Sequence, residues 1–290
     1  MPKVITPEGC GIRQVVFDAS TAGRAFAGLK LTEMPTTSPE EAIAAIYSTL
    51  AKTWGPQHWW PAQSRFEVIV GAYLTQNTNW SNVELALKNL RKARVLSLGG
   101  IRRVPTPRLE RLIRSSGYFR QKARNLKKFV KFVDRNYGGS LTEMFSRSTA
   151  VLREQLLALN GVGPETADSI LLYAGQHPVF VVDAYTRRMA ARHGILSERA
   201  GYEEFRALFE RALATAPKVL TSTSDFASRG SASHTPSRMS LARRTPLAQV
   251  FNEMHGLVVS AGKQYCLKSK AQCEQCPLGP LLPQDNSPRI

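Results

Sequence analysis

The chain is short of acidic residues. Its 290 residues include only 22 Asp and Glu against 39 Lys and Arg, which gives a formal charge of +17. Such a deficit argues against a typical enzyme of small neutral metabolites, because the field around the protein attracts polyanions. We expect a nucleic-acid partner, bound with release of counterions from its phosphates, and keep a merely basic protein or a binder of anionic membrane as alternatives.

Long apolar runs are absent too. No stretch of about 18 apolar residues occurs, so no membrane-spanning helix is expected. The first residues also lack the layout of a signal peptide, because Glu8 and Asp18 interrupt them. We therefore expect a cytoplasmic, nucleoid-associated bacterial protein that is monomeric and has no membrane partner.

Cysteine is scarce and unevenly placed. Of four cysteines, Cys10 stands near the start of the chain, and Cys266, Cys273 and Cys276 stand close together. This arrangement does not indicate a disulfide framework. It suits a reducing compartment and a loop that binds a metal or a cluster.

The apolar pattern predicts an all-α protein. Beyond residue 36, apolar residues recur at spacings of three and four, and cap signals such as Ser38-Pro39-Glu40-Glu41 separate the segments. The predicted helices cover residues 39–52, 65–75, 82–93, 108–115, 120–137, 149–159, 165–174, 183–193, 202–214 and 246–261.

Three segments need separate treatment. Residues 1–37 give no strong signal and are predicted to be poorly structured. Residues 221–244 are rich in Ser, Thr, Arg and Gly, and are predicted to form a disordered basic insertion. Residues 120–137 carry many Lys and Arg around an apolar stripe, which is typical either of a solvated helix face or of a track along phosphates.

A glycine turn stands between two predicted helices. In Asn160-Gly161-Val162-Gly163-Pro164 the glycines allow a tight turn whose backbone N–H groups, at the positive end of the next helix, can bind one phosphate. A plain helical hairpin with a glycine cap is the other interpretation. A helix, a His-Pro pair and four apolar residues then lead to Asp183, which either only caps the following helix or serves as a catalytic carboxylate.

This arrangement resembles the helix-hairpin-helix DNA glycosylases of the endonuclease III superfamily. The resemblance implies two helical lobes with the active site in the cleft between them, acting on double-stranded damaged DNA. Asp183 would stabilise an oxocarbenium-like transition state and orient or deprotonate water. The implied parts are a terminal-helix lobe of residues 38–63 and 183–265, a barrel lobe of residues 64–182 with the hairpin, and a cysteine loop of residues 266–283.

Members of this superfamily that also cut the backbone carry a lysine two residues after the second glycine of the turn. That position is Glu165, which cannot form an imine. The resemblance therefore implies a monofunctional glycosylase, with Glu165 serving only the helix dipole. A bifunctional glycosylase and abasic-site lyase for oxidised pyrimidines is one alternative, and a non-catalytic helix-hairpin-helix DNA-binding protein is another.

Trp59, Trp60 and Trp80 stand in two short segments, where they either pack in the core or stack on a flipped, cationic alkylated base. Trp59-Trp60-Pro61 and the run from Thr75 to Trp80 look most like the bacterial 3-methyladenine DNA glycosylase III branch. By that likeness the tryptophans line the base pocket, and the base is an alkylated purine.

The same likeness assigns three further positions. Gln76 would enter the gap left by the extruded nucleotide, with Asn77 beside it on the DNA. Lys263 would lie at the pocket. A modified lysine of that branch corresponds to Leu257, so this feature is absent here.

In the superfamily, the spacing of Cys266, Cys273 and Cys276 belongs to a 4Fe-4S cluster whose fourth cysteine follows five residues later. That position is Leu282. The resemblance thus implies a cluster that takes its fourth ligand from Cys10 or another group. A three-cysteine zinc site with His255 and a loop that has lost its cluster are the alternatives.

Overall fold

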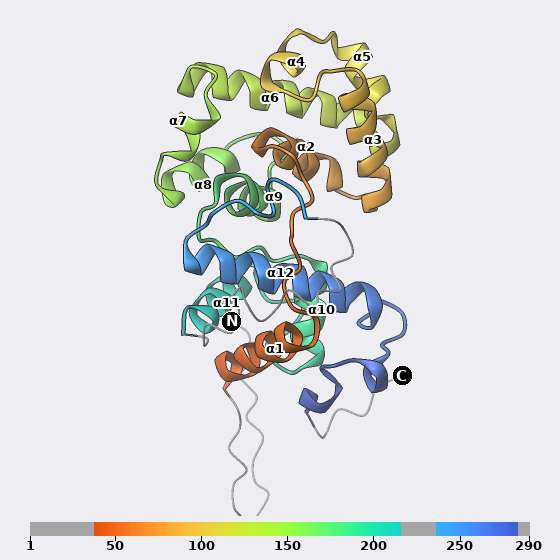
Figure 1. Cartoon of the computed structure of the whole chain (residues 1–290), viewed down its shortest axis with the longest axis vertical. Coiled ribbons are helices and arrows are strands. Elements are labelled where there is room, and N and C mark those ends of the chain that lie inside the picture. Colours follow the sequence, from red (N-terminus) through yellow and green to blue (C-terminus); the bar gives the residue numbers. More distant parts are fainter. Residues whose placement is uncertain (1–37, 216–235, 284–290) are drawn as a thin grey trace, which may run out of the picture. The chain divides into compact units, whose positions relative to one another are not determined.

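The computed structural model describes residues 38–215 and 236–283, and the prediction for residues 1–37 lies outside these ranges. All described residues belong to one compact unit, and their helices contain none long and apolar enough to cross a bilayer. No β-strand occurs among them beyond an isolated bridge between Cys266 and Ala271, so the all-α prediction is confirmed. The helices labelled in Figure 1 are α1 (Pro39–Trp54), α2 (Arg65–Thr75), α3 (Trp80–Lys92), α4 (Leu98–Arg103), α5 (Thr106–Leu112), α6 (Phe119–Tyr137), α7 (Leu141–Phe145), α8 (Thr149–Leu157), α9 (Pro164–Ser169), α10 (Ala184–Arg192), α11 (Tyr202–Thr215) and α12 (Pro246–Gln264).

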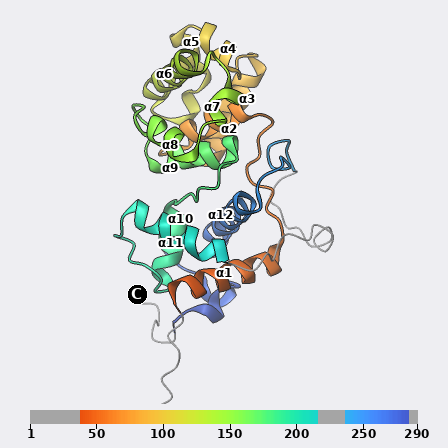
Figure 2. The ribbon, with the colours of Figure 1, turned by 90° about the vertical axis from the view of Figure 1, so that its left-hand side faces the viewer.

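Two lobes make up this unit (Figure 1 and Figure 2). The terminal lobe consists of α1, α10, α11 and α12, which pack on one another, and the barrel lobe consists of α2 to α9, in which α2 contacts α3, α6 and α9. The chain crosses between the lobes after α1 and again at residues 176–183. α12 contacts both lobes, because it also packs on the π-helix Ile170–Gly175. The predicted two-lobed architecture is confirmed.

Capping side chains set where the helices begin. The capping box at Ser38 opens α1 as predicted. α3 begins earlier than predicted, because its N-cap is Asn79 and not Ser81, and the Asn79 Oδ1 accepts the amide N–H of Asn82. Trp80 is therefore the first residue of a helix and not part of a loop.

The helix predicted over residues 165–174 changes its winding part-way. α9 ends at Ser169, and the backbone continues as the π-helix Ile170–Gly175, in which Tyr173 is fully buried. The four apolar residues 179–182 that follow are buried but form no strand. They lead directly into Asp183, which is therefore anchored by a segment embedded in the core.

Residues 236–244 are folded, although they lie in the segment 221–244 that is predicted to be disordered. The hydroxyl of Ser237 accepts the amide N–H of Ala62 and donates to the carbonyl of Trp60, both at 3.1 Å. The prediction is wrong for this part, because a count of apolar residues overlooks hydroxyl groups that satisfy buried backbone groups. The rest of the segment lies outside the described ranges.

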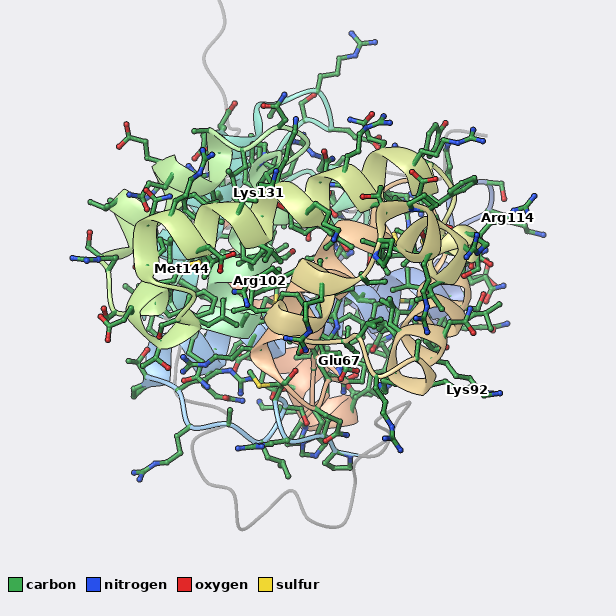
Figure 3. The ribbon with its side chains drawn as sticks, turned by 90° about the horizontal axis from the view of Figure 1, so that it is seen from above. Glu67, Lys92, Arg102, Arg114, Lys131 and Met144 are labelled. Carbon is green, nitrogen blue, oxygen red and sulfur yellow. The ribbon has the colours of Figure 1, made fainter. Side chains whose placement is uncertain are left out.

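Basic side chains of α6 are partly structural. Lys122 is buried, its ammonium donates to two backbone carbonyls at 2.9 and 2.6 Å, and burial lowers its pKa to about 8. Lys127 donates to the carbonyl of Arg102. α6 lies at the end of the barrel lobe farthest from α10 and α12, and Figure 3 looks onto this end, where Lys131 and Arg102 lie. These positions favour the solvated-face interpretation of α6 over a phosphate track.

Candidate active site

A pocket of about 530 Å³ opens between the two lobes, within the size range of small-ligand sites. Its walls come from the segment after α1, the turn between α2 and α3, the start of α9, the start of α10, and α12. The residues predicted for chemistry, base contact and entry into the duplex all line it, namely Trp59, Trp60, Gln76, Asn77, Trp80, Asp183 and Lys263. Residues that are far apart in sequence thus meet at one site.

The two carboxylate oxygens of Asp183 have different partners. Oδ1 accepts hydrogen bonds from the amide and the hydroxyl of Thr186, at 2.8 and 3.0 Å, so the side chain is the N-cap of α10. Oδ2 lies 3.6 Å from Nε2 of His255, and the residue lines the pocket. Asp183 can therefore cap α10 and also act in the pocket. Because Oδ1 is bound to the start of α10, the position of Oδ2 is fixed as well.

His255 lines this pocket too, which the sequence does not indicate. It is buried on α12, with Nδ1 2.6 Å from the hydroxyl of Tyr173. Burial lowers the pKa of His255, against the opposing charge of Asp183, and burial also raises the pKa of Tyr173 well above its usual value. The carboxylate of Asp183 beside Nε2 favours the neutral tautomer with its proton on Nε2, and in this tautomer Nδ1 accepts the hydrogen bond of the Tyr173 hydroxyl. The zinc interpretation with His255 is wrong, because this side chain does not line the pocket of the cysteines.

Glu165, in the first turn of α9, lines the same pocket. The surrounding protein raises the pKa of its carboxyl to about 7, first by burial and then by the charge of Asp183, while Arg187 acts in the opposite direction. The residue is nevertheless exposed to solvent on one side. A carboxyl that titrates near neutrality suggests a role beyond the helix dipole.

Replacement of Glu165 by Gln is expected to change how stability depends on pH. The folded chain holds the Glu165 proton more tightly than an unfolded chain with a pKa of 4.5, so the free energy of unfolding falls as pH rises from about 4.5 to about 7. The Gln variant lacks this term and should lose less stability between pH 5 and pH 8 in urea titrations. An equal loss in both proteins would contradict the raised pKa.

The glycine turn joins α8 to α9 and contacts Gln76, the residue predicted to enter the gap left by the extruded nucleotide. Gly161 has a φ of 80°, and a Cβ there would come within 2.1 Å of the Nδ2 of Asn125, so a side chain is strained at this position. Gly163 is the N-cap of α9. Gln76 donates from Nε2 to the carbonyl of Gly161 at 2.9 Å, and Asn77 follows it, exposed and at a φ of 52°. The side chain of Gln76 is therefore held against the glycine turn by a hydrogen bond.

The three tryptophans form one aromatic cluster at the pocket. The ring centroid of Trp60 lies 5.5 Å from the centroid of Trp59. It lies 5.2 Å from the centroids of both Trp80 and Tyr173. Trp60 is only 5% exposed and belongs to the core, whereas Trp59 and Trp80 are half-buried. Lys263 holds its ammonium 5.7 Å from the ring centroid of Trp59. Core packing thus accounts for Trp60, while Trp59 and Trp80 keep surface available for a base.

Comparison with known proteins identifies the family. Residues 70–215 match the model of the HhH-GPD superfamily base excision DNA repair protein. The chain is also 42% identical over 241 residues to the protein named "Putative DNA repair glycosylase MJ1434" of Methanocaldococcus jannaschii. This alignment covers 82% of this chain and 94% of that protein. The chain belongs to the HhH-GPD superfamily. It is a DNA glycosylase of base excision repair. The alternative hypothesis of a non-catalytic DNA-binding protein is therefore wrong.

Solved structures of other HhH-GPD proteins show the same fold. The chain is similar to the H. pylori 3-methyladenine DNA glycosylase MagIII bound to 1,N6-ethenoadenine, with 29% identity, a TM-score of 0.61, and coverage of 78% of this chain and 98% of that one. A trapped endonuclease III–DNA covalent intermediate matches with 22% identity and a TM-score of 0.63, covering 83% of this chain and 94% of that one. The predicted superfamily is confirmed, but both types of relative occur, so membership does not choose between their chemistries.

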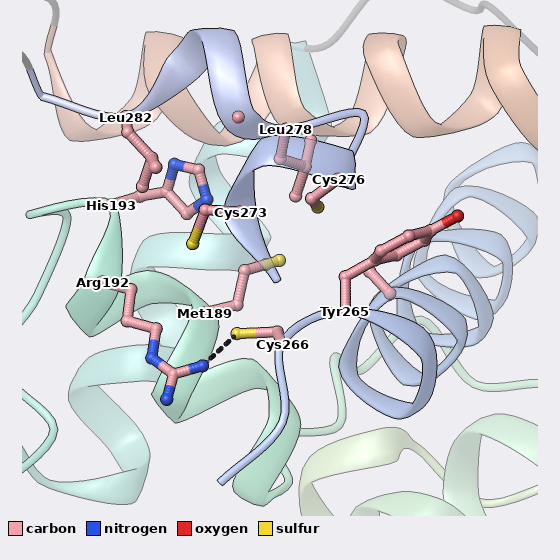
Figure 4. Close-up of a pocket in the computed structure, with 11 residues that line it drawn as sticks. Met189, Arg192, His193, Tyr265, Cys266, Cys273, Cys276, Leu278 and Leu282 are labelled. Carbon is pink, nitrogen blue, oxygen red and sulfur yellow. Dashed lines mark hydrogen bonds between the residues drawn. The ribbon is translucent and has the colours of Figure 1, made fainter. Parts of the chain in front are cut away.

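The three clustered cysteines of this HhH-GPD glycosylase line a second pocket, in the terminal lobe (Figure 4). We call Cys266, Cys273 and Cys276 the pocket cysteines. The Sγ of Cys266 accepts a hydrogen bond from Arg192 at 3.1 Å, and Leu282 adds only hydrocarbon at the position of the expected fourth cysteine. Across residues 38–215 and 236–283, no three His, Cys, Asp or Glu side chains are close enough to hold one metal ion. A single zinc ion therefore does not fit, whereas three thiols spread around one cavity suit a larger group with several metal atoms.

Proposed function

We propose that this DNA glycosylase flips alkylated purines of the 3-methyladenine type out of double-stranded DNA and removes them by hydrolysis, leaving the strand uncut. The observation that carries the proposal is the pairing of Asp183 in the pocket with Glu165 at the lysine position of the bifunctional enzymes. Glu165 cannot form a covalent imine with the sugar, so water is the nucleophile.

The chemistry follows from where Asp183 is held. As the glycosidic bond breaks, the sugar carbon becomes cationic, and a fixed carboxylate beside it lowers the barrier. Oδ1 is occupied by Thr186, so Oδ2 is the oxygen that faces the developing charge or the attacking water. Nε2 of His255, a ring held at Nδ1 by Tyr173, faces Oδ2 at 3.6 Å.

The environment of the pocket supports a cationic base. Asp183 and Glu165 both place carboxyl groups in it, and the partly exposed rings of Trp59 and Trp80 offer π-faces. A purine alkylated on its ring carries a positive charge, which aromatic faces and carboxylates both attract. Lys263 is the opposing positive charge, and its ammonium lies against Trp59 at the exposed end of α12.

Removal of one aromatic face should therefore affect charged bases more than neutral ones. We expect Trp80→Leu to slow release of 3-methyladenine by roughly 30-fold, the equivalent of about 2 kcal/mol for a desolvated cation-π contact. Release of neutral hypoxanthine should fall much less, and Trp80→Phe should retain most of the activity on both bases. Equal losses for charged and neutral bases would show that the ring acts only through shape.

A second function rests on Lys263, which places an amine in the pocket. A bifunctional glycosylase and lyase acting on oxidised pyrimidines would use such an amine to form an imine with the sugar. The two functions differ in whether a covalent adduct forms and in whether the strand is cut.

The test uses duplexes that contain a methylated purine or an oxidised pyrimidine, read for free base and for strand cleavage before and after alkali. We expect free methylated purine, cleavage only after alkali, and no adduct on treatment with borohydride. A Lys263→Gln variant is the matched control. An adduct that forms with the wild-type chain and disappears in this variant would replace the proposal by the lyase.

We also propose that the pocket cysteines hold a 4Fe-4S cluster. Residues at the end of α10 and at the end of α12 both line the pocket of the cysteines. A cluster there would therefore link the ends of these two helices. The cysteine pocket and the active-site pocket have no lining residue in common. The cluster is therefore assigned to structure, and no step of base removal depends on it.

A further inference from the structure

The cysteine pocket contains one donor that the spacing of the cysteines does not reveal. His193, the residue after the end of α10, lines the pocket together with the three pocket cysteines and Leu282 (Figure 4). Its amide N–H donates to the carbonyl of Met189 at 3.1 Å, which fixes its backbone on the last turn of the helix. The side chain of the preceding residue, Arg192, already contacts the Sγ of Cys266.

The ring of His193 makes the kind of contact at its second nitrogen that metal-binding histidines make. Its Nδ1 lies 3.3 Å from the carbonyl oxygen of Leu281. A carbonyl only accepts hydrogen bonds, so Nδ1 carries the proton and Nε2 has a free lone pair. Histidines that bind metals almost always donate their second ring N–H to a carbonyl or carboxylate in this way. Here the carbonyl belongs to the residue directly before Leu282, the position where a fourth cysteine would stand.

We propose that His193 is the fourth protein ligand of a four-iron cluster whose other ligands are the pocket cysteines. Leucine at position 282 removes the fourth thiolate, and the imidazole from the neighbouring helix end replaces it. The ligand set becomes three cysteines and one histidine. This inference rests on the proposed cluster and does not depend on which base is removed.

Two other donors are weaker candidates. Met189 also lines the pocket, but its thioether is neutral and has no second polar group to orient it. Cys10 lies outside the described residues. Both serve as controls in the experiment.

The test begins with the full chain, isolated without oxygen and supplied with iron and sulfide. Absorption near 400 nm, iron and sulfide content, and reduction potential are then measured. Four variants are compared with the wild type: His193→Ala, His193→Ala with Leu282→Cys, Met189→Leu and Cys10→Ala. Thermal unfolding of each variant reports whether it folds.

We expect one four-iron cluster in the wild type and in the Met189 and Cys10 variants. His193→Ala should lose an iron or most of the absorption, and the added Leu282→Cys should restore both. The restored cluster should have a lower reduction potential than the wild type, because histidine ligands raise the potential relative to cysteine. If His193→Ala does not fold, Leu282→Cys alone decides, with a lower potential supporting the proposal and an unchanged one overturning it.

Other outcomes would overturn the proposal. These are a wild-type chain that binds zinc or no metal, a His193→Ala cluster with unchanged content and potential, or loss of the cluster on replacement of Met189 or Cys10.

Discussion

Asp183→Asn is expected to reduce base release by about 10³-fold or more while the protein keeps its fold and its affinity for DNA. Asparagine caps helices about as well as aspartate, so its side-chain oxygen can still accept from the amide of Thr186. The other position changes from an anionic oxygen near His255 to a neutral NH₂ group. The variant therefore loses the charge that opposes the sugar cation, and electrostatic and general-base contributions of this kind are each worth about 10² to 10⁴ in rate.

The measurement is single-turnover release of methylated purine, with binding to abasic DNA and thermal unfolding as controls. Asp183→Ala separates the two roles of the side chain. It should lose the same activity and, in addition, about 1 kcal/mol of stability from the missing cap. Release by Asp183→Asn close to that of the wild type would remove Asp183 from the mechanism.

Arg153→Met is expected to lower the free energy of unfolding by about 3–5 kcal/mol, because it leaves a buried carboxylate without its ion-pair partner. Arg153 of α8 donates two hydrogen bonds to Asp168 of α9, at 2.7 and 3.1 Å, and Asp168 is 0% exposed. The pair spans the two helices of the glycine turn, and Arg153 also contacts Glu203 of α11 in the terminal lobe. In a protein of this size the loss corresponds to a fall in Tm of about 10 °C.

The defect should depend on pH. Burial raises the pKa of Asp168, and Arg153 is the main group that lowers it. Without Arg153 the fold binds a proton at Asp168 more tightly than the unfolded chain, so stability falls as pH rises and the defect is larger at pH 8 than at pH 5. The double variant Arg153→Met with Asp168→Asn carries no buried charge and should recover much of the loss. Urea titrations of both variants at both pH values measure this, and a single variant as stable as the wild type would show that the ion pair is dispensable.

Several parts of the site could be predicted because their signals are local. The turn around Gly161 needs glycine within a few residues, and Asp183 carries a capping signal directly after an apolar run. The segment that begins at Gln76 likewise has a short signature. Each of these requirements is met by neighbours in sequence, so the residue pattern records it.

Other parts could not be predicted because they depend on contacts between distant segments. His255 is one of a run of buried positions on α12, and only its contacts with Tyr173 and Asp183 distinguish it. The raised pKa of Glu165 depends on the cleft around it. The burial of Ser237 depends on a contact with residues more than 170 positions earlier in the chain.

The cysteine loop shows the same division. The spacing of the pocket cysteines and the leucine at position 282 are visible in the sequence. That His193 lies beside this position is visible only in the fold, because the end of α10 and the loop after α12 are brought together there.

By itself the sequence determined the all-α class, the basic charge that suits DNA, the glycine turn, the carboxylate one helix later and the absence of a lysine at position 165. The tertiary structure alone decided which of these residues form one pocket, which tryptophans remain partly exposed, which histidine lies beside the aspartate and which lies beside the cysteines. The physical reason is that capping, turn formation and periodicity act over a few residues, whereas burial, pKa shifts and donor sets arise from packing between segments far apart in the chain.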